Sequence, residues 1–90
     1  MPVPNIIVDD PDLEISGLQW SIGMPALQLD ACYTGSQLSV MCQYQASDQN
    51  EQEIQSGCSG TLAQNLRTHQ SVNFTPQTKA QVRKIRFFIA

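Results

Sequence analysis

The sequence predicts an all-β fold: a small antiparallel β-sandwich or barrel-like domain of about five to seven short strands, with a central hairpin over residues 27–46. Apolar and polar residues alternate without a fault along 27–33 and again along 38–46, which is the period of a strand with one buried face. Turn-forming residues separate these and the other β-prone runs. The 90 residues fit a single domain, 1–90, since compact domains usually contain about 50–250 residues.

Residues 1–8 are expected to form an extended N-terminal arm. Pro2 and Pro4 favour extended backbone and block a helix, and the β-branched residues that follow them favour a strand. Residues 9–12 (DDPD) predict a turn, because proline fixes φ and aspartate accepts hydrogen bonds from nearby amides. A calcium loop is the alternative, but these aspartates lack the alternating oxygen ligands and the closing glutamate of such loops.

Residues 13–22 predict a strand that changes face at Gly17. Leu13 and Ile15 share one parity, whereas the large residues after Gly17 take the other. A period of two that slips by one residue at a glycine is typical of a β-bulge, or of a strand that crosses between two sheets. Trp20 lies among aliphatic residues and is expected in a core or an interface; the alternative is a platform on which a sugar stacks.

The hairpin prediction combines a turn with a register. Residues 35–36 (GS) can occupy the centre of a two-residue type II′ turn. This turn pairs Tyr33 with Leu38, and it places four apolar pairs of the two strands on the same face. Cys32 and Cys42 then point to opposite faces, so no disulfide is expected between them.

Residues 47–60 are expected to form a long polar loop, because Ile54 is their only aliphatic residue. Cys58 lies in this loop between small residues and is the cysteine best placed to meet another thiol. Three cysteines allow at most one disulfide within the chain. Residues 61–74 predict two short strands broken near residues 68–69, with a short helical turn as the alternative.

The last segment, residues 76–90, allows a helix or a strand. Thr75 followed by a proline can begin a helix. The period-2 repeat of Ile85, Phe87 and Ile89 favours a strand, so a strand is predicted. The final ten residues also contain three of the five basic residues. An end this apolar must be buried, either in its own domain or against another molecule.

Charge is segregated along the chain. Residues 1–66 carry all eight acidic residues, and residues 67–90 carry all five basic ones. We expect the two ends to lie side by side and neutralise each other within the fold; head-to-tail attraction between subunits is the alternative. A pI near 4.7 argues against nucleic acid as a partner, since phosphate is bound by basic surfaces.

The residues predict no catalytic site, no cofactor and no metal centre, and therefore a protein that is not an enzyme. His69 is the single histidine, and no acid or cysteine lies close to it in sequence. Neither a glycine-rich phosphate loop nor a nucleophile with a base at a recognisable spacing occurs. No apolar run reaches the ~18 residues of a membrane span, and residues 1–8 show no export signal. We expect a protein made in the cytoplasm, with no membrane association.

These features predict a structural or assembly protein, a small β-domain that docks on other protein subunits and on copies of itself. A virion is one setting, with the protein as a decoration, cement or connector component. The interface candidates are the apolar residues of the two termini, one tryptophan and one arginine: Ile6, Ile7, Val8, Trp20, Arg86, Phe87, Phe88 and Ile89. The alternative is that the two terminal strands pair with each other inside the domain.

Two other functions are alternatives. A carbohydrate-binding module would stack Trp20, Tyr33 or Tyr44 on sugar rings and bond hydroxyls with Gln and Asn side chains. The predicted hairpin counts against it, because both tyrosines fall on the apolar face. A small inhibitor or antitoxin-like protein would cover a basic target with its acidic half.

Overall fold

The computed structural model describes residues 4–19, 26–37, 39–63, 66–73 and 76–89. This part of the chain confirms the all-β prediction, and its one helix is neither long nor apolar enough to cross a membrane. The elements, in order, are β1 (Asn5–Val8), β2 (Leu13–Gln19), β3 (Ala26–Tyr33), β4 (Ser39–Ser47), β5 (Glu53–Ala63), β6 (Leu66–Asn73), α1 (Pro76–Gln81) and β7 (Lys84–Ile89).

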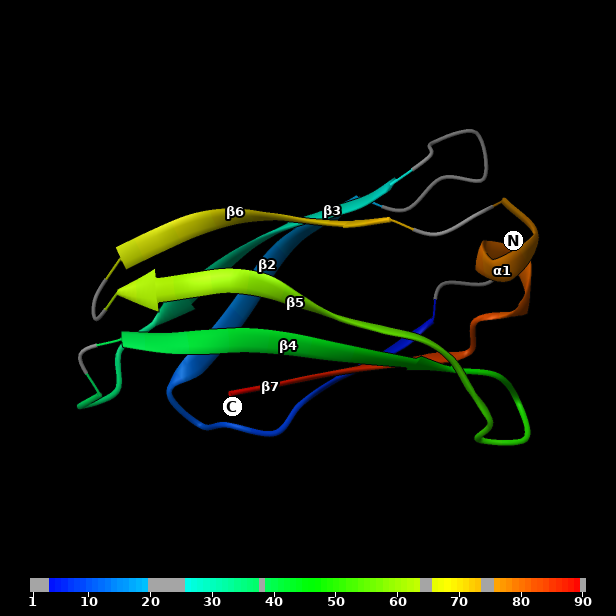
Figure 1. The fold of residues 1–90 in the computed structure, drawn as a ribbon, viewed down its shortest axis with the longest axis horizontal. Helices are drawn as coiled ribbons and strands as arrows, with labels where there is room; N and C mark the ends of the chain where they lie inside the picture. Colours follow the sequence, from blue (N-terminus) through cyan, green and yellow to red (C-terminus); the bar gives the residue numbers. More distant parts are fainter. Residues whose placement is uncertain (1–3, 20–25, 38, 64–65, 74–75, 90) are drawn as a thin grey trace.

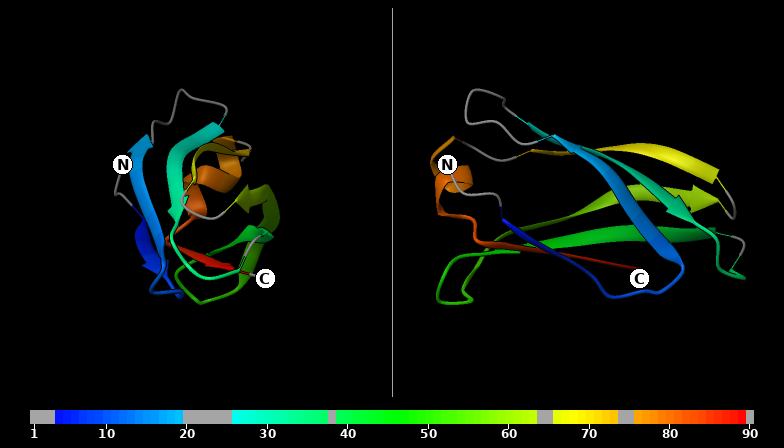
Figure 2. Two further views of the ribbon diagram at one scale, coloured as in Figure 1. Left: turned by 90° about the vertical axis from the view of Figure 1, so that its left-hand side faces the viewer. Right: turned by 180° about the vertical axis from the view of Figure 1, so that it is seen from behind.

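The strands form two sheets, one with the order β1-β7-β4-β5 and one with the order β2-β3-β6 (Figures 1 and 2). One described pair departs from the predicted antiparallel arrangement, because β1 and β7 run in parallel. The other described pairs are antiparallel. β1 is free to run parallel to β7 because most of the chain separates them, so no tight hairpin turn fixes their relative direction.

The core lies between the two sheets, and each sheet supplies one alternating row of side chains. The buried apolar residues of β3 and β4 are Leu27, Leu29, Ala31, Tyr33, Val40, Cys42, Tyr44 and Ala46. Ile85 and Phe87 of β7 are fully buried beside them, as is Val82, which follows α1. The alternation in the sequence therefore predicts correctly which face each of these strands buries.

The predicted hairpin is wrong in its pairing, although both of its strands exist. β3 pairs with β2 and β6, whereas β4 pairs with β5 and β7, so residues 34–37 connect the two sheets. The two apolar rows face each other across the core instead of lying side by side. Gly35 lacks the positive φ of a type II′ turn. A glycine fits at this position for another reason: a Cβ there would overlap the Tyr33 ring.

β2 contains the predicted bulge. Gly17 has a φ of 64°, a left-handed conformation that glycine adopts without steric cost. The pairing with β3 shifts register between Ser16 and Gln19. The extra residue changes the parity of the strand, so that Ile15 and Leu18 both pack against the core.

The predicted polar loop over residues 47–60 is wrong. The loop is short, and β5 begins at Glu53 and continues to Ala63. The predicted strand break near residues 68–69 is also wrong, since both residues lie within β6. The inward side of β5 carries Gln55 and Gly57, opposite Ala46 and Tyr44 of β4. No apolar repeat is needed there because the Tyr44 ring lies against Gly57.

The C-terminal segment, residues 76–90, contains both a helix and a strand. α1 is a short helix of six residues, and β7 is the predicted strand. Arg83 lies between them, and its Nη1 donates hydrogen bonds to the carbonyl oxygens of Ala80 and Val82 at 2.9 and 3.2 Å. These bonds satisfy carbonyl groups that the end of a helix leaves without a partner.

Candidate functional site

All the predicted interface residues that the structure describes lie on β1 and β7, which are neighbours. Residues 5–8 pair in register with residues 84–87, and the amides of Asn5 and Asp9 donate hydrogen bonds to carbonyl oxygens of Arg83 and Phe87, both at 2.9 Å. The alternative that the two terminal strands pair with each other inside the domain is therefore what the structure shows. Trp20 lies outside the described residues.

The side chains of β7 are mostly committed to the domain itself. Phe87 is fully buried in the core, and Ile6 and Ile89 pack against its edge. Ile7 and Phe88 are half-buried, and Val8 is 36% exposed. β7 has β1 on one side and β4 on the other, so its backbone has no free edge to offer a partner.

A row of polar side chains crosses the outer face of the four-stranded sheet. Arg86 Nε donates to Asp9 Oδ2, and Arg86 Nη1 donates to Gln45 Oε1 at 3.3 Å. Gln45 Nε2 in turn donates to Glu53 Oε1 at 3.1 Å. The guanidinium carbon of Arg86 also lies 4.5 Å from the centre of the Phe88 ring, within cation–π range. These contacts link Asp9, at the end of β1, to β7, β4 and β5.

The segregated charges of the sequence meet within the chain. Besides the Arg86–Asp9 ion pair, Lys84 Nζ lies 3.6 Å from Glu51 Oε1. These contacts agree with the expectation that the acidic and basic parts of the chain neutralise each other. The glutamate side chain is 81% exposed, and ion pairs this exposed contribute little to stability.

A groove of about 460 Å³ lies along the polar row. Its lining residues are Gln43, Tyr44, Gln45, Glu53, Ser56, Gly57, Arg86 and Phe88. Tyr44 is only 7% exposed, and its hydroxyl accepts a hydrogen bond from Gln55 Nε2 at 3.2 Å. The groove therefore offers amides, a hydroxyl, one carboxylate and the partly exposed guanidinium of Arg86, groups that suit hydrogen bonding at an interface.

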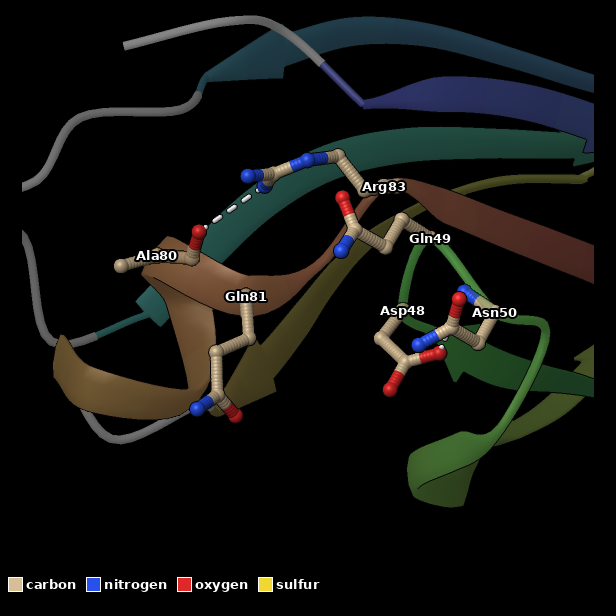
Figure 3. Close-up of a pocket in the computed structure, with 6 residues that line it drawn as sticks. All are labelled: Asp48, Gln49, Asn50, Ala80, Gln81 and Arg83. Atoms are coloured by element: carbon tan, nitrogen blue, oxygen red, sulfur yellow. Dashed lines mark hydrogen bonds between the residues drawn. The ribbon is translucent and has the colours of Figure 1, made fainter.

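A second hollow, of about 280 Å³, lies between the β4–β5 turn and the end of α1 (Figure 3). Its charged groups hold local backbone. Asp48 Oδ1 accepts hydrogen bonds from the amides of Asn50 and Gln52 at 2.8 and 2.9 Å, while Arg83 caps α1. This arrangement stabilises a turn and a helix end, and it brings together no acid–base pair.

The cysteines and the histidine do not converge on a described site. Cys32 is half-buried and Cys42 fully buried, and neither is part of a disulfide. Cys58 lies in β5 opposite Gln43, and His69 lies in β6 opposite Asp30; only their backbone positions are described. Within the described ranges, no three His, Cys, Asp or Glu residues are grouped so that they could hold a metal ion.

The four edge strands of the two sheets differ in how well they are protected against pairing with another chain. β1 has four residues and is followed by Asp9. β2 is interrupted by the bulge at Gly17, and β6 carries Arg67 near its start. β5 is the longest, with 11 residues, and Glu53 is its single charged residue. Its pairing with β4 is irregular at Ile54 and again between residues 58 and 61. Short length, bulges and charges protect natural edges; β5 is the longest described edge and has little charge, with its regular stretch at residues 55–58.

The β5 edge was missed at the sequence level because its apolar content is low. The residue that could have revealed this strand is Gly57, which lies among small residues in the segment predicted to be a loop. A glycine opposite a large aromatic residue on the next strand is a known pairing in sheets. Tyr44 is the neighbour of Gly57 in the register. No known family model, curated protein or solved structure was found to match this chain.

Proposed function

We propose that this protein is a non-catalytic structural or assembly protein, a small β-domain that docks on other protein subunits. The observation that carries the proposal is the β5 edge. β5 ends the four-stranded sheet, so one side of its backbone has no strand partner in the described part of the chain. Such an edge binds an extended segment through main-chain hydrogen bonds, which is the β-addition mode of recognition.

The accessible part of this edge is the first half of β5. β5 and β6 lie close together next to residues 64–65 and move apart toward the start of β5 (Figures 1 and 2). We place the docking edge on this first half of β5, where Glu53 and Ser56 are exposed. β4, the inner neighbour of this stretch, carries no charged residue. An approaching chain then meets a nearly neutral strip, although the whole protein has a net charge of −3.

The carbohydrate alternative loses its support from the tyrosines. Tyr33 is 3% and Tyr44 7% exposed, so neither ring offers a face on which a sugar can stack. Phe88 has a guanidinium over its ring. The assembly function rests instead on backbone groups, which need no exposed aromatic residue. A virion as the setting stays a prediction.

The proposal is tested by crosslinking from the edge in the cells that produce the protein. Ser56 is exposed on β5, and it is replaced by the photo-crosslinking residue p-benzoylphenylalanine. Gln37 is exposed in the segment that connects the two sheets. It receives the same replacement and serves as the control. We expect a discrete protein adduct from position 56 that position 37 does not give. If position 56 gives no adduct, or if both positions give the same adducts, the proposal that β5 is the docking edge is refuted.

A further inference from the structure

We infer that the strand which docks on β5 is β5 of a second copy of this chain, paired antiparallel about a two-fold axis at Ser56. The two four-stranded sheets then continue into one sheet across the dimer. This inference rests on the proposed function and names its partner. A two-fold interface places the same patch on both subunits, so the patch must be complementary to itself.

The side chain at the axis meets this condition. Ser56 is exposed and lies on the same face as Gln45, its neighbour in the register. A serine hydroxyl both donates and accepts a hydrogen bond, so two serines opposite each other can bond across the axis. Cross-strand pairs of hydroxyl residues stabilise a sheet. A charged residue at this position would instead face its own copy and repel it.

The one charge on β5 is kept away from its copy by the antiparallel direction. Residues 55–57 pair with 57–55 of the second copy, and Glu53 lies beyond the irregularity at Ile54, six positions along the strand from the Glu53 of that copy. At ~3.4 Å per residue this separation is about 20 Å. Exposed charges interact weakly beyond a Debye length of about 8 Å at physiological salt. The repulsion between the two carboxylates is therefore screened.

The charges at the ends of this pairing are complementary. Glu53 begins β5, and Glu51 lies in the turn before it, where its Oε1 is also 3.6 Å from Lys84 Nζ. β6, which begins with Leu66 and Arg67, follows the other end of β5. The two-fold axis brings the acidic end of each copy toward the basic end of its partner. Head-to-tail attraction between the acidic and basic parts of the sequence would thus operate across the β5 edge.

The first test is the mass of the intact chain in solution over a wide range of concentration. Light scattering should show the mass rising from 10.0 kDa toward twice that value between about 5 and 500 µM, because so small an interface gives a weak complex. Ser56→Lys places like charges opposite each other and should weaken the dimer at least tenfold. Gln37→Lys makes the same change of charge in a connecting segment and should leave the mass curve unchanged. Circular dichroism checks that both variants are folded.

The second test fixes the register. With Cys32 and Cys58 replaced by serine, Ser56→Cys places two thiols opposite each other, with Cα atoms about 4.5–5.5 Å apart, a spacing that a disulfide can bridge. Diamide, which takes up the two electrons and two protons that the thiols lose, should link the chains rapidly. Gln37→Cys in the same background should stay monomeric under denaturing, non-reducing electrophoresis.

The outcomes separate this inference from the proposed function. A chain that stays at 10.0 kDa up to about 500 µM would contradict the inference that a second copy docks on β5. If position 56 then crosslinks to a different protein in cells, the docking edge stands without self-association. If the chain dimerises but Ser56→Lys has no effect and Ser56→Cys does not link, the dimer uses another surface and the inference fails.

Discussion

The contact between Gly57 and Tyr44 gives the sharpest test of how β5 is held in the sheet. The ring of Tyr44 lies so close to Gly57 that an added Cβ would be 2.6 Å from Cε1 and 2.9 Å from Cζ and Oη. Carbon atoms in good contact lie about 3.5–4.0 Å apart. Gly57→Ala therefore forces the ring or the strand to move by about 1 Å.

Two opposing terms determine the size of the effect. Replacing a glycine in a conformation that alanine tolerates stabilises a protein by about 0.4–1 kcal/mol, because the unfolded chain has less freedom to lose. Overpacking a well-filled site costs about 1–3 kcal/mol. The ring of Tyr44 is buried, and its hydroxyl is bonded to Gln55, so it has little freedom to move aside. We expect Gly57→Ala to lower the free energy of unfolding by about 1–2 kcal/mol.

Urea denaturation measures this change as a shift of the midpoint at constant slope. The control is the same substitution in a Tyr44→Val background, where the ring is gone. There Gly57→Ala should stabilise the protein, so its effect changes sign. Equal effects in the two backgrounds, or a stable Gly57→Ala variant in the natural background, would contradict the contact between Tyr44 and Gly57 as the reason for the glycine.

Three further predictions concern the rest of the fold. Deleting residues 85–90 removes the strand between β1 and β4, so circular dichroism should show an unfolded chain rather than a folded monomer. Arg86→Met should lower stability by about 1 kcal/mol in urea titrations, because the guanidinium joins several strands; Lys84→Met should change it by less than about 0.5 kcal/mol, since its ion pair is exposed. Cys42, fully buried, should react with a thiol reagent only on unfolding, whereas the half-buried Cys32 should react in the native protein; equal rates for the two thiols would contradict their placement.

Sequence patterning alone determined the fold class and the buried faces. The period-2 rows of β3 and β4, the bulge at Gly17 and the burial of the C-terminal strand follow from local rules, because side-chain parity is a property of the strand itself. The strand neighbours do not follow from these rules. An apolar row fills a core equally well beside its partner or across from it, and only the packing of both sheets placed residues 34–37 between layers rather than in a hairpin.

The candidate site depended on tertiary structure for a related reason. The inward position of β5 at Gly57 is filled by the ring of Tyr44 from the neighbouring strand, so this part of the strand needs no apolar residue of its own and resembles a loop in sequence. The terminal residues looked like free interface segments, because their apolar character requires burial but does not specify the partner. The pairing of β1 with β7 joined them within the domain, where Phe87 is fully buried and Val8 is still exposed. β5 is instead an edge that a partner can reach, because the order of the strands decides which strand lies at the end of a sheet.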